Sequence, residues 1–358
     1  MRMRLAALLT VLAVAIPFAA AQEKKAPPAK AEDDRQALLN QMIKDFVKAR
    51  NEAFAAVRSA KTDQERKDAE AKLPKEADFL PQVHKVIAAD ATDDIAGETL
   101  AFAVFGLKSN DAKVMDALSK NFVKTDKIKR FVQMSMGNPT DAAKPVLEKV
   151  LADNQSKDIK GMACYALGEI AFAKEDGKGA KDAETYFARV EKEYKDIAMG
   201  GATLGDMAKG SLFELRNLQV GMKAPNATSK NLKDEKVSLA DYKGKVVVLD
   251  IWATWCGPCK AMIPHEREMV KKLEGKPFAF ISISADDEKK TLEDFIVKEP
   301  MPWNHWWDGP EASILKTWNI RYFPTIYVID AKGVIRHKGL RGEELEKAVE
   351  KLVAEVGK

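Results

Sequence analysis

The chain has 358 residues, which is enough for two domains of ordinary size. Its formal net charge is only +4 at pH 7, and no run of basic residues is interleaved with aromatic residues, so we expect no nucleic-acid partner. The three cysteines, Cys164, Cys256 and Cys259, are too few for a fold that is held together mainly by disulfides.

Residues 1–21 have the three parts of a secretory signal peptide. Arg2 and Arg4 precede an apolar core over residues 5–18, and an Ala-x-Ala site ends at Ala21. The core is shorter than the roughly 20 residues that a membrane-spanning helix needs. We therefore predict export to the periplasm or another extracytoplasmic space, with an uncleaved membrane anchor as the alternative.

Two segments of different character follow the leader. Residues 22–33 are charged and contain two prolines, which predicts a flexible linker. Residues 34–217 have helical patterns throughout; over residues 36–49, for example, apolar side chains recur at helical spacing. We expect an all-helical domain over 34–217, in which Cys164 is a buried and unreactive thiol.

An internal repeat lies within this helical domain. Seven residues of the segment 81–97 recur at 145–161 without a gap, an offset of 64 residues. This pattern predicts a duplicated multi-helix unit, as in a short solenoid. The outer surface of such a domain commonly binds another protein, and the alternative is a spacer or packing domain.

From residue 219 onward the pattern changes to alternating strands and helices. Short apolar runs that are rich in β-branched or aromatic residues predict strands over 245–252, 278–284 and 325–330. Amphipathic segments predict helices over 259–273, 289–299 and 343–356. We expect residues 219–358 to form an α/β domain with a central sheet flanked by helices.

Cys256 and Cys259 form a Cys-x-x-Cys pair between the first of these strands and the first helix. A zinc site would need a second pair, and the four histidines have no ligand spacing, so we predict no metal. A Cys-x-x-Cys-His haem site would need histidine at position 260, where Lys260 stands. The remaining interpretation is a reversible dithiol.

The position of the pair at a helix start assigns different tasks to the two sulfurs. Unpaired backbone N–H groups and the helix dipole favour an anion at that end, so we expect a lowered pKa for Cys256 and attack by its thiolate. Pro258 follows Gly257 near the first helical position, where a missing N–H group costs little. Cys259, one turn further on, would then resolve a mixed disulfide.

Asp250 stands within the apolar strand before the cysteines. Burial makes a charged carboxylate expensive there, so we expect a raised pKa. Such a carboxyl near the resolving thiol can accept and return a proton. The alternative is an aspartate at a strand end that is bonded to backbone amides.

The Phe323–Pro324 step precedes another predicted strand. An X-Pro bond at that place can be cis or trans. A cis bond beside the cysteines would leave the Phe323 backbone free to pair with an extended substrate chain, whereas a trans bond would be an ordinary strand start.

Residues 219–358 resemble the thioredoxin superfamily, and most closely its exported TlpA/ResA-like redoxins. The resemblance rests on "WATWCGPCK" and on the later Phe-Pro-Thr at 323–325. It implies a thioredoxin-like fold with Cys256 as nucleophile and Cys259 as resolver. It also implies that Trp255 flanks the site, that Pro324 is the cis-proline, and that Pro264 kinks the active-site helix.

Two departures from that family concern proton handling. Its members often carry asparagine where Asp250 stands, and they often carry glutamate three residues after the second cysteine. Here that second position is Met262. We therefore expect the glutamate role to be absent and Asp250 to handle the proton, as in thioredoxins themselves.

Together these features predict an extracytoplasmic thiol–disulfide oxidoreductase that reduces protein disulfides through the CGPC dithiol and a mixed disulfide. Trp255, Gly257, Pro258, Phe323 and Pro324 would contact the substrate. We expect no cofactor beyond the redox-active cysteine pair, a membrane thiol carrier as electron donor, and a possible protein partner on the helical domain. The alternatives are a peroxiredoxin-like thiol peroxidase and a helical-repeat adaptor with a secondary redoxin module.

Overall fold

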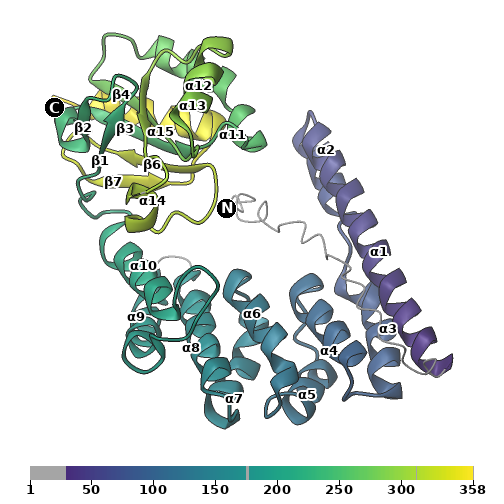
Figure 1. The fold of residues 1–358 in the computed structure, drawn as a ribbon. Coiled ribbons are helices and arrows are strands. Elements are labelled where there is room, and N and C mark those ends of the chain that lie inside the picture. The colour runs from purple at the N-terminus through teal and green to yellow at the C-terminus, as the bar shows by residue number, and fades with distance from the viewer. Residues whose placement is uncertain (1–29, 175–176, 312, 358) are drawn as a thin grey trace. The chain divides into compact units, whose positions relative to one another are not determined.

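The computed structural model describes residues 30–174, 177–311 and 313–357 (Figure 1). The predicted signal peptide, residues 1–21, lies outside them. The chain forms two compact units, which divide between Ala208 and Lys209. Across the described residues, every helix is either too short or too polar to cross a membrane.

The N-terminal unit is helical, as the sequence pattern predicted. Its α-helices are α1 (Lys30–Ser59), α2 (Asp63–Glu70), α3 (Glu76–Ala89), α4 (Asp94–Ala101), α5 (Ala112–Asn121), α6 (Lys129–Gly137), α7 (Lys144–Asp153), α8 (Lys157–Phe172), α9 (Ala180–Arg189) and the first part of α10 (Leu204–Asn217). Helix α8 is buried on all sides and contacts α6, α7 and α9, so it forms the centre of this unit. It contains the buried free thiol of Cys164, as expected.

The first helix begins earlier than the sequence analysis placed it. Residues 30–33, which we assigned to the flexible linker, are helical in the structure and begin α1. Alanine and glutamate have high intrinsic helix propensity. These local preferences outweigh the charged composition from which we inferred a linker.

The helix pairs α3–α4, α5–α6, α7–α8 and α9–α10 repeat along the unit. They begin at residues 76, 112, 144 and 180, in steps of 36, 32 and 36 residues. The first helices of successive pairs contact one another, α3 with α5 and α5 with α7, and the second helices α6 and α8 also make contact. This is a solenoid arrangement, and the sequence offset of 64 residues relates its first pair to its third.

The two segments that match in sequence also share a turn. Asp90 Oδ1 accepts a hydrogen bond from the backbone N–H of Thr92 at 2.8 Å, and Asn154 Oδ1 accepts one from Ser156 at 2.9 Å. Asp90 and Asn154 occupy equivalent positions in the repeat. A short polar side chain that bonds to the backbone two residues on favours a turn over continued helix.

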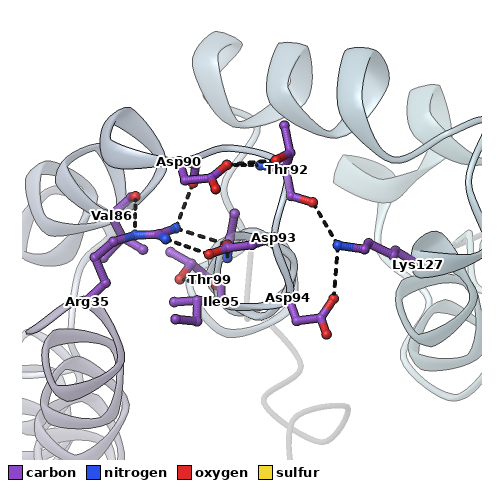
Figure 2. Close-up of polar contacts among 10 residues, drawn as sticks. Arg35, Val86, Asp90, Thr92, Asp93, Asp94, Ile95, Thr99 and Lys127 are labelled. Atoms are coloured by element: carbon purple, nitrogen blue, oxygen red, sulfur yellow. Dashed lines mark hydrogen bonds and ion pairs between the residues drawn. The ribbon is translucent and has the colours of Figure 1, made fainter. Parts of the chain in front are cut away.

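The long helix α1 is tied to the turn between α3 and α4, as Figure 2 shows. The Arg35 guanidinium donates to both carboxylate oxygens of Asp93, at 2.6 and 3.0 Å. It also donates to the backbone oxygens of Val86 and Asp90. From the opposite side, Lys127 donates to a backbone oxygen of the same turn. One arginine therefore satisfies several acceptors and fixes α1 against the first helix pair.

The C-terminal unit is a mixed seven-stranded sheet with helices on both faces, which confirms the predicted thioredoxin-like class. Its strands are β1 (Thr228–Asn231), β2 (Lys236–Ser238), β3 (Val246–Trp252), β4 (Phe278–Ser284), β5 (Asn304–Trp307), β6 (Thr325–Ile329) and β7 (Ile335–Lys338). Their order is β2-β1-β5-β4-β3-β6-β7. The helices are α11 (Gly257–Lys260), α12 (Ile263–Lys272), α13 (Lys289–Lys298), α14 (Ser313–Thr317) and α15 (Gly342–Glu355).

Strand β3 is an interior strand of this sheet, parallel to β4 and antiparallel to β6. All of its residues are buried, because helices cover both faces. Val247, Leu249 and Ile251 pack on one face with α14. Val246 and Val248 pack on the other face with α12 and α15, in a group of side chains that we call the α12–α15 cluster. Asp250 belongs to this second face because side chains alternate along a strand.

Candidate active site

The two cysteines of the CGPC motif form a disulfide where β3 gives way to a helix. Cys256 is the N-cap of α11, and the Cα atoms of Cys256 and Cys259 lie 5.3 Å apart. The backbone N–H of Cys259 donates to Cys256 Sγ at 3.2 Å. This geometry offers a donor to the sulfur that the sequence analysis expected to carry charge.

The helix after the cysteines is interrupted. We predicted one helix over 259–273, whereas the structure has the short α11 and then α12, with Pro264 in the first turn of α12. Proline lacks an N–H group and its ring clashes with the preceding turn, so the helix breaks just before it. This is the kink that the family resemblance implied.

The exposed side of the site is aromatic. Trp255 is 66% exposed, whereas both cysteines are buried. The Trp255 ring meets the Phe323 ring edge-on, with centroids 5.5 Å apart. The Phe323–Pro324 peptide bond is cis, and Phe323 packs against the cysteines. The structure therefore brings together these residues from two distant parts of the sequence.

The loop that carries Trp255 is held by a buried aspartate that the sequence analysis missed. The Asp286 carboxylate accepts hydrogen bonds from the Thr254 hydroxyl at 2.7 Å, the Thr254 backbone N–H at 3.2 Å and the Ser284 hydroxyl at 2.6 Å. Asp286 is the second residue after the end of β4. A polar residue at the end of a buried strand, beside the one that carries the cysteines, was the available signal.

Asp250 lies in β3 behind the disulfide. It is 4% exposed, and its Oδ1 atom has no hydrogen-bond partner among the described residues. Burial raises the pKa of the Asp250 carboxyl, and the positive charge of Arg341 partly opposes that rise. Asp250 is the fifth of the seven residues of β3, and the pairing with β4 continues through Trp252, so the alternative of an aspartate at a strand end does not fit.

A second buried carboxyl belongs to Glu266 in α12. Glu266 is 2% exposed, and its Oε1 atom also has no partner within the described chain. Burial raises the pKa of Glu266, and the nearby charge of Asp250 raises it further. Position 262 has no glutamate, as noted, but a glutamate one turn later faces the core. The only signal in the sequence is its spacing of three residues from the apolar Ile263 and Met269, which does not by itself show that this face of the helix is buried.

Arg341 joins the proline segment to this buried region. It is the N-cap residue of α15, and its guanidinium donates to the Pro324 carbonyl oxygen at 3.2 Å. Its Nε atom is buried without a hydrogen-bond partner among the residues that the structure describes. Arg341 is therefore a half-buried cation beside the site.

The other titratable groups offer no second centre. Cys164 lies in α8 of the helical unit, where burial raises the pKa of its thiol to about 12. Within the described ranges, no three histidine, cysteine or acidic side chains are placed to hold a metal ion.

Comparisons with known proteins match the C-terminal unit. Residues 220–338 match the AhpC/TSA family. The chain is 26% identical over 160 residues to the thiol-disulfide oxidoreductase ResA of Bacillus cereus, covering 45% of this chain and 91% of that protein. It is 34% identical over 122 residues to the thioredoxin-like protein YneN of Bacillus subtilis, and this match covers 33% of this chain and 70% of that protein. Among solved structures, it is similar to the thioredoxin domain of a thiol-disulfide oxidoreductase from Bacteroides vulgatus, with 32% sequence identity and a TM-score of 0.36. The match covers 38% of this chain and 99% of that domain's chain.

Proposed function

Because the chain belongs, through its C-terminal unit, to the thioredoxin-like thiol–disulfide oxidoreductases of the ResA/TlpA type, we propose that it reduces disulfides in proteins outside the cytoplasm. The observation that carries this proposal is the Cys256–Cys259 disulfide at a helix start, with a backbone N–H directed at Cys256. The exposed Trp255 and the neighbouring Phe323 supply an apolar border for a substrate chain.

The first step is attack on the substrate by the reduced enzyme. The Cys256 thiolate forms a bond to one sulfur of the substrate disulfide, and the other substrate sulfur leaves as a thiolate. The Cys259 N–H group and the start of α11 stabilise the attacking anion. The Phe323 backbone, beside the disulfide, is available to pair with the extended substrate.

The second step releases the substrate. Asp250 takes the proton of the Cys259 thiol, and the Cys259 thiolate attacks Cys256 Sγ. The bond between Cys256 and the substrate breaks, and the second substrate sulfur leaves and is protonated. Two electrons have passed from the enzyme dithiol to the substrate disulfide, which leaves the enzyme in the disulfide form.

The cycle needs an external dithiol to return the enzyme to its reduced state. The predicted leader supports placement outside the cytoplasm, where a membrane thiol carrier is the expected donor. The solenoid of the helical unit offers a surface for a protein partner. Direction follows from the reduction potential of the cysteine pair relative to its surroundings.

The test combines a potential with trapped substrates. In the full chain, a potential of the Cys256–Cys259 pair near about −270 mV supports a reductant, and one near about −120 mV indicates an oxidant instead. Cys259→Ser should accumulate mixed disulfides with client proteins, and Cys256→Ser should not. Cys164→Ala is the matched control, because that buried thiol lies outside the site. Insulin reduction that survives Cys256→Ser contradicts the proposal.

A further inference from the structure

Asp250 lies between two groups of side chains on one face of β3. Two residues before it, Val248 packs in the α12–α15 cluster. Two residues after it, Trp252 packs with Cys256 and Cys259. Because alternate residues of a strand share a face, the Asp250 carboxyl enters the layer between the sheet and α12, directly behind the cysteines.

Glu266 occupies the matching place on α12. Three residues before it, Ile263 packs with the two cysteines, and three residues after it, Met269 packs in the α12–α15 cluster. Residues three apart lie on the same face of a helix. Strand and helix therefore each place a carboxyl group at the boundary between the same two clusters, in the same layer.

The ionisation of each carboxyl depends on the charge of the other, because both lie buried in the same layer. Both side chains are more than nine-tenths buried, and Asp250 Oδ1 and Glu266 Oε1 have no hydrogen-bond partner among the described residues. Two like charges in such a layer repel strongly, so the second ionisation is disfavoured once the first has occurred. Arg341 supplies a positive charge that favours ionisation of Asp250.

Other titratable groups adjoin this layer from several elements. On α12, His265 Nε2 lies 3.4 Å from Glu346 Oε2 of α15. From β5, His305 Nδ1 lies 2.8 Å from the hydroxyl of Ser282, the residue of β4 that pairs with Asp250. Burial lowers the pKa of His305, which favours the neutral form of that ring. Lys272 of α12 binds the same Glu346 at 2.8 Å, and in the reduced enzyme the two cysteine thiols and Arg341 adjoin the layer as well.

We infer that Asp250 and Glu266 form a single proton-holding pair behind the dithiol, with Glu266 as a positioning residue that sets the charge on Asp250. This inference rests on the proposed function, because the proton that the pair accepts is that of the Cys259 thiol. With one proton already in the pair, Asp250 is the carboxylate that takes the second. The pair is then neutral while the Cys259 thiolate attacks, and it returns one proton when Cys259 is reduced again.

The pair can be titrated without involving either cysteine. In the oxidised full chain neither sulfur ionises, so the carbon-13 signals of the two side-chain carboxyls report only the pair. We expect two linked steps in the wild-type protein. In Asp250→Asn, the pKa of Glu266 should fall by more than about 1 unit, the size of interaction that makes two sites titrate together. An unchanged titration of Glu266 in Asp250→Asn overturns the inference.

A second measurement follows the chemistry. The rate at which Cys259 resolves a mixed disulfide, measured against pH, should be alike in wild type and Glu266→Gln at pH 6. In alkaline solution Glu266→Gln should be up to about tenfold faster, because the wild-type pair then carries a second negative charge that opposes the Cys259 thiolate. Glu268→Gln, an exposed position on the same helix, is the control and should follow wild type.

The outcomes separate this inference from the proposed function. Superimposable pH profiles for wild type and Glu266→Gln contradict the pairing, even if both proteins reduce disulfides. If the wild-type protein reduces no disulfide, the proposed function fails, and the titration of the oxidised protein still decides whether the pair exists. Should Glu266→Gln not fold, the titrations of wild type and Asp250→Asn give the answer.

Discussion

The oxidised wild-type protein should lose stability as the pH rises. Replacing Asp250 with asparagine should abolish much of that loss. Asp250 is 4% exposed, and burial raises its pKa from the ordinary 3.8 to about 7, with partial opposition from Arg341. The folded protein therefore binds this proton more tightly than the unfolded chain does. The stabilisation is complete below the unfolded pKa and is lost as the pH rises through the folded one.

The size of the effect follows from that shift. A rise from 3.8 to about 7 is about three units, or about 4 kcal/mol at about 1.36 kcal/mol per unit. Somewhat less than half of this is already lost at pH 5, because the unfolded carboxyl is mostly ionised there while the folded one is protonated. Between pH 5 and pH 8 the wild-type protein should therefore lose about 2–3 kcal/mol through Asp250. Asparagine has nearly the same shape and does not ionise.

The assay is urea unfolding of the oxidised full chain at the two pH values, followed by tryptophan fluorescence. All six tryptophans lie between residues 252 and 318, so the signal reports the C-terminal unit even though the helical unit is present. Asp287→Asn, an exposed neighbour of the site, is the control and should follow wild type. Because Glu266 remains in the variant, we expect a smaller residual loss. An equal loss in wild type and Asp250→Asn refutes the reasoning.

Three further predictions test the supporting structure. Asp286→Ala should slow thiol–disulfide exchange about tenfold, because Thr254 loses the partner that holds the loop before the cysteines; stopped-flow exchange at the wild-type rate contradicts this. Asn154→Ala should lower the stability of the helical unit by about 1–3 kcal/mol, because the buried backbone carbonyl of Val123 and the partly buried one of Thr125 lose their donor; circular dichroism during unfolding measures it. Gly168→Ala should also cost about 1–3 kcal/mol, because the new Cβ would lie 2.5 Å from the Phe187 ring; a variant as stable as wild type shows that the ring can move.

The parts of the site that depend on local sequence could be predicted from it. The CGPC motif follows a β-branched apolar run and precedes an amphipathic segment, so its place at a strand-to-helix junction needs no tertiary information. Asp250 was recognisable because it interrupts that run. In the helical unit, the match between 81–97 and 145–161 indicated a repeat, and the equivalent turns at Asp90 and Asn154 account for the spacing of that match.

The parts that depend on packing could not be predicted in the same way. Whether Glu266 faces solvent or core depends on how α12 turns after Pro264, and a glutamate in an amphipathic helix is ordinarily exposed. The role of Asp286 requires β4 to lie beside β3, which becomes clear only once the strand order is known. The helix-pair repeat was partly hidden because the sequence match skips the second pair.

The burial of Asp250 and Glu266 indicates that these two residues have a chemical role rather than a structural one. A leucine or methionine at either position would fill the same layer and would avoid the cost of a carboxyl without a hydrogen-bond partner. Within the part of the chain that the structure describes, neither Asp250 Oδ1 nor Glu266 Oε1 makes a hydrogen bond. Nor can Arg341 neutralise both groups, because one positive charge does not balance two carboxylates and a negative charge would remain in the buried layer. Near neutral pH this arrangement favours neither the fully ionised pair nor the fully protonated pair. Such a pair is poorly suited to stabilise the fold, but it is well suited to accept a proton from a thiol and to return it.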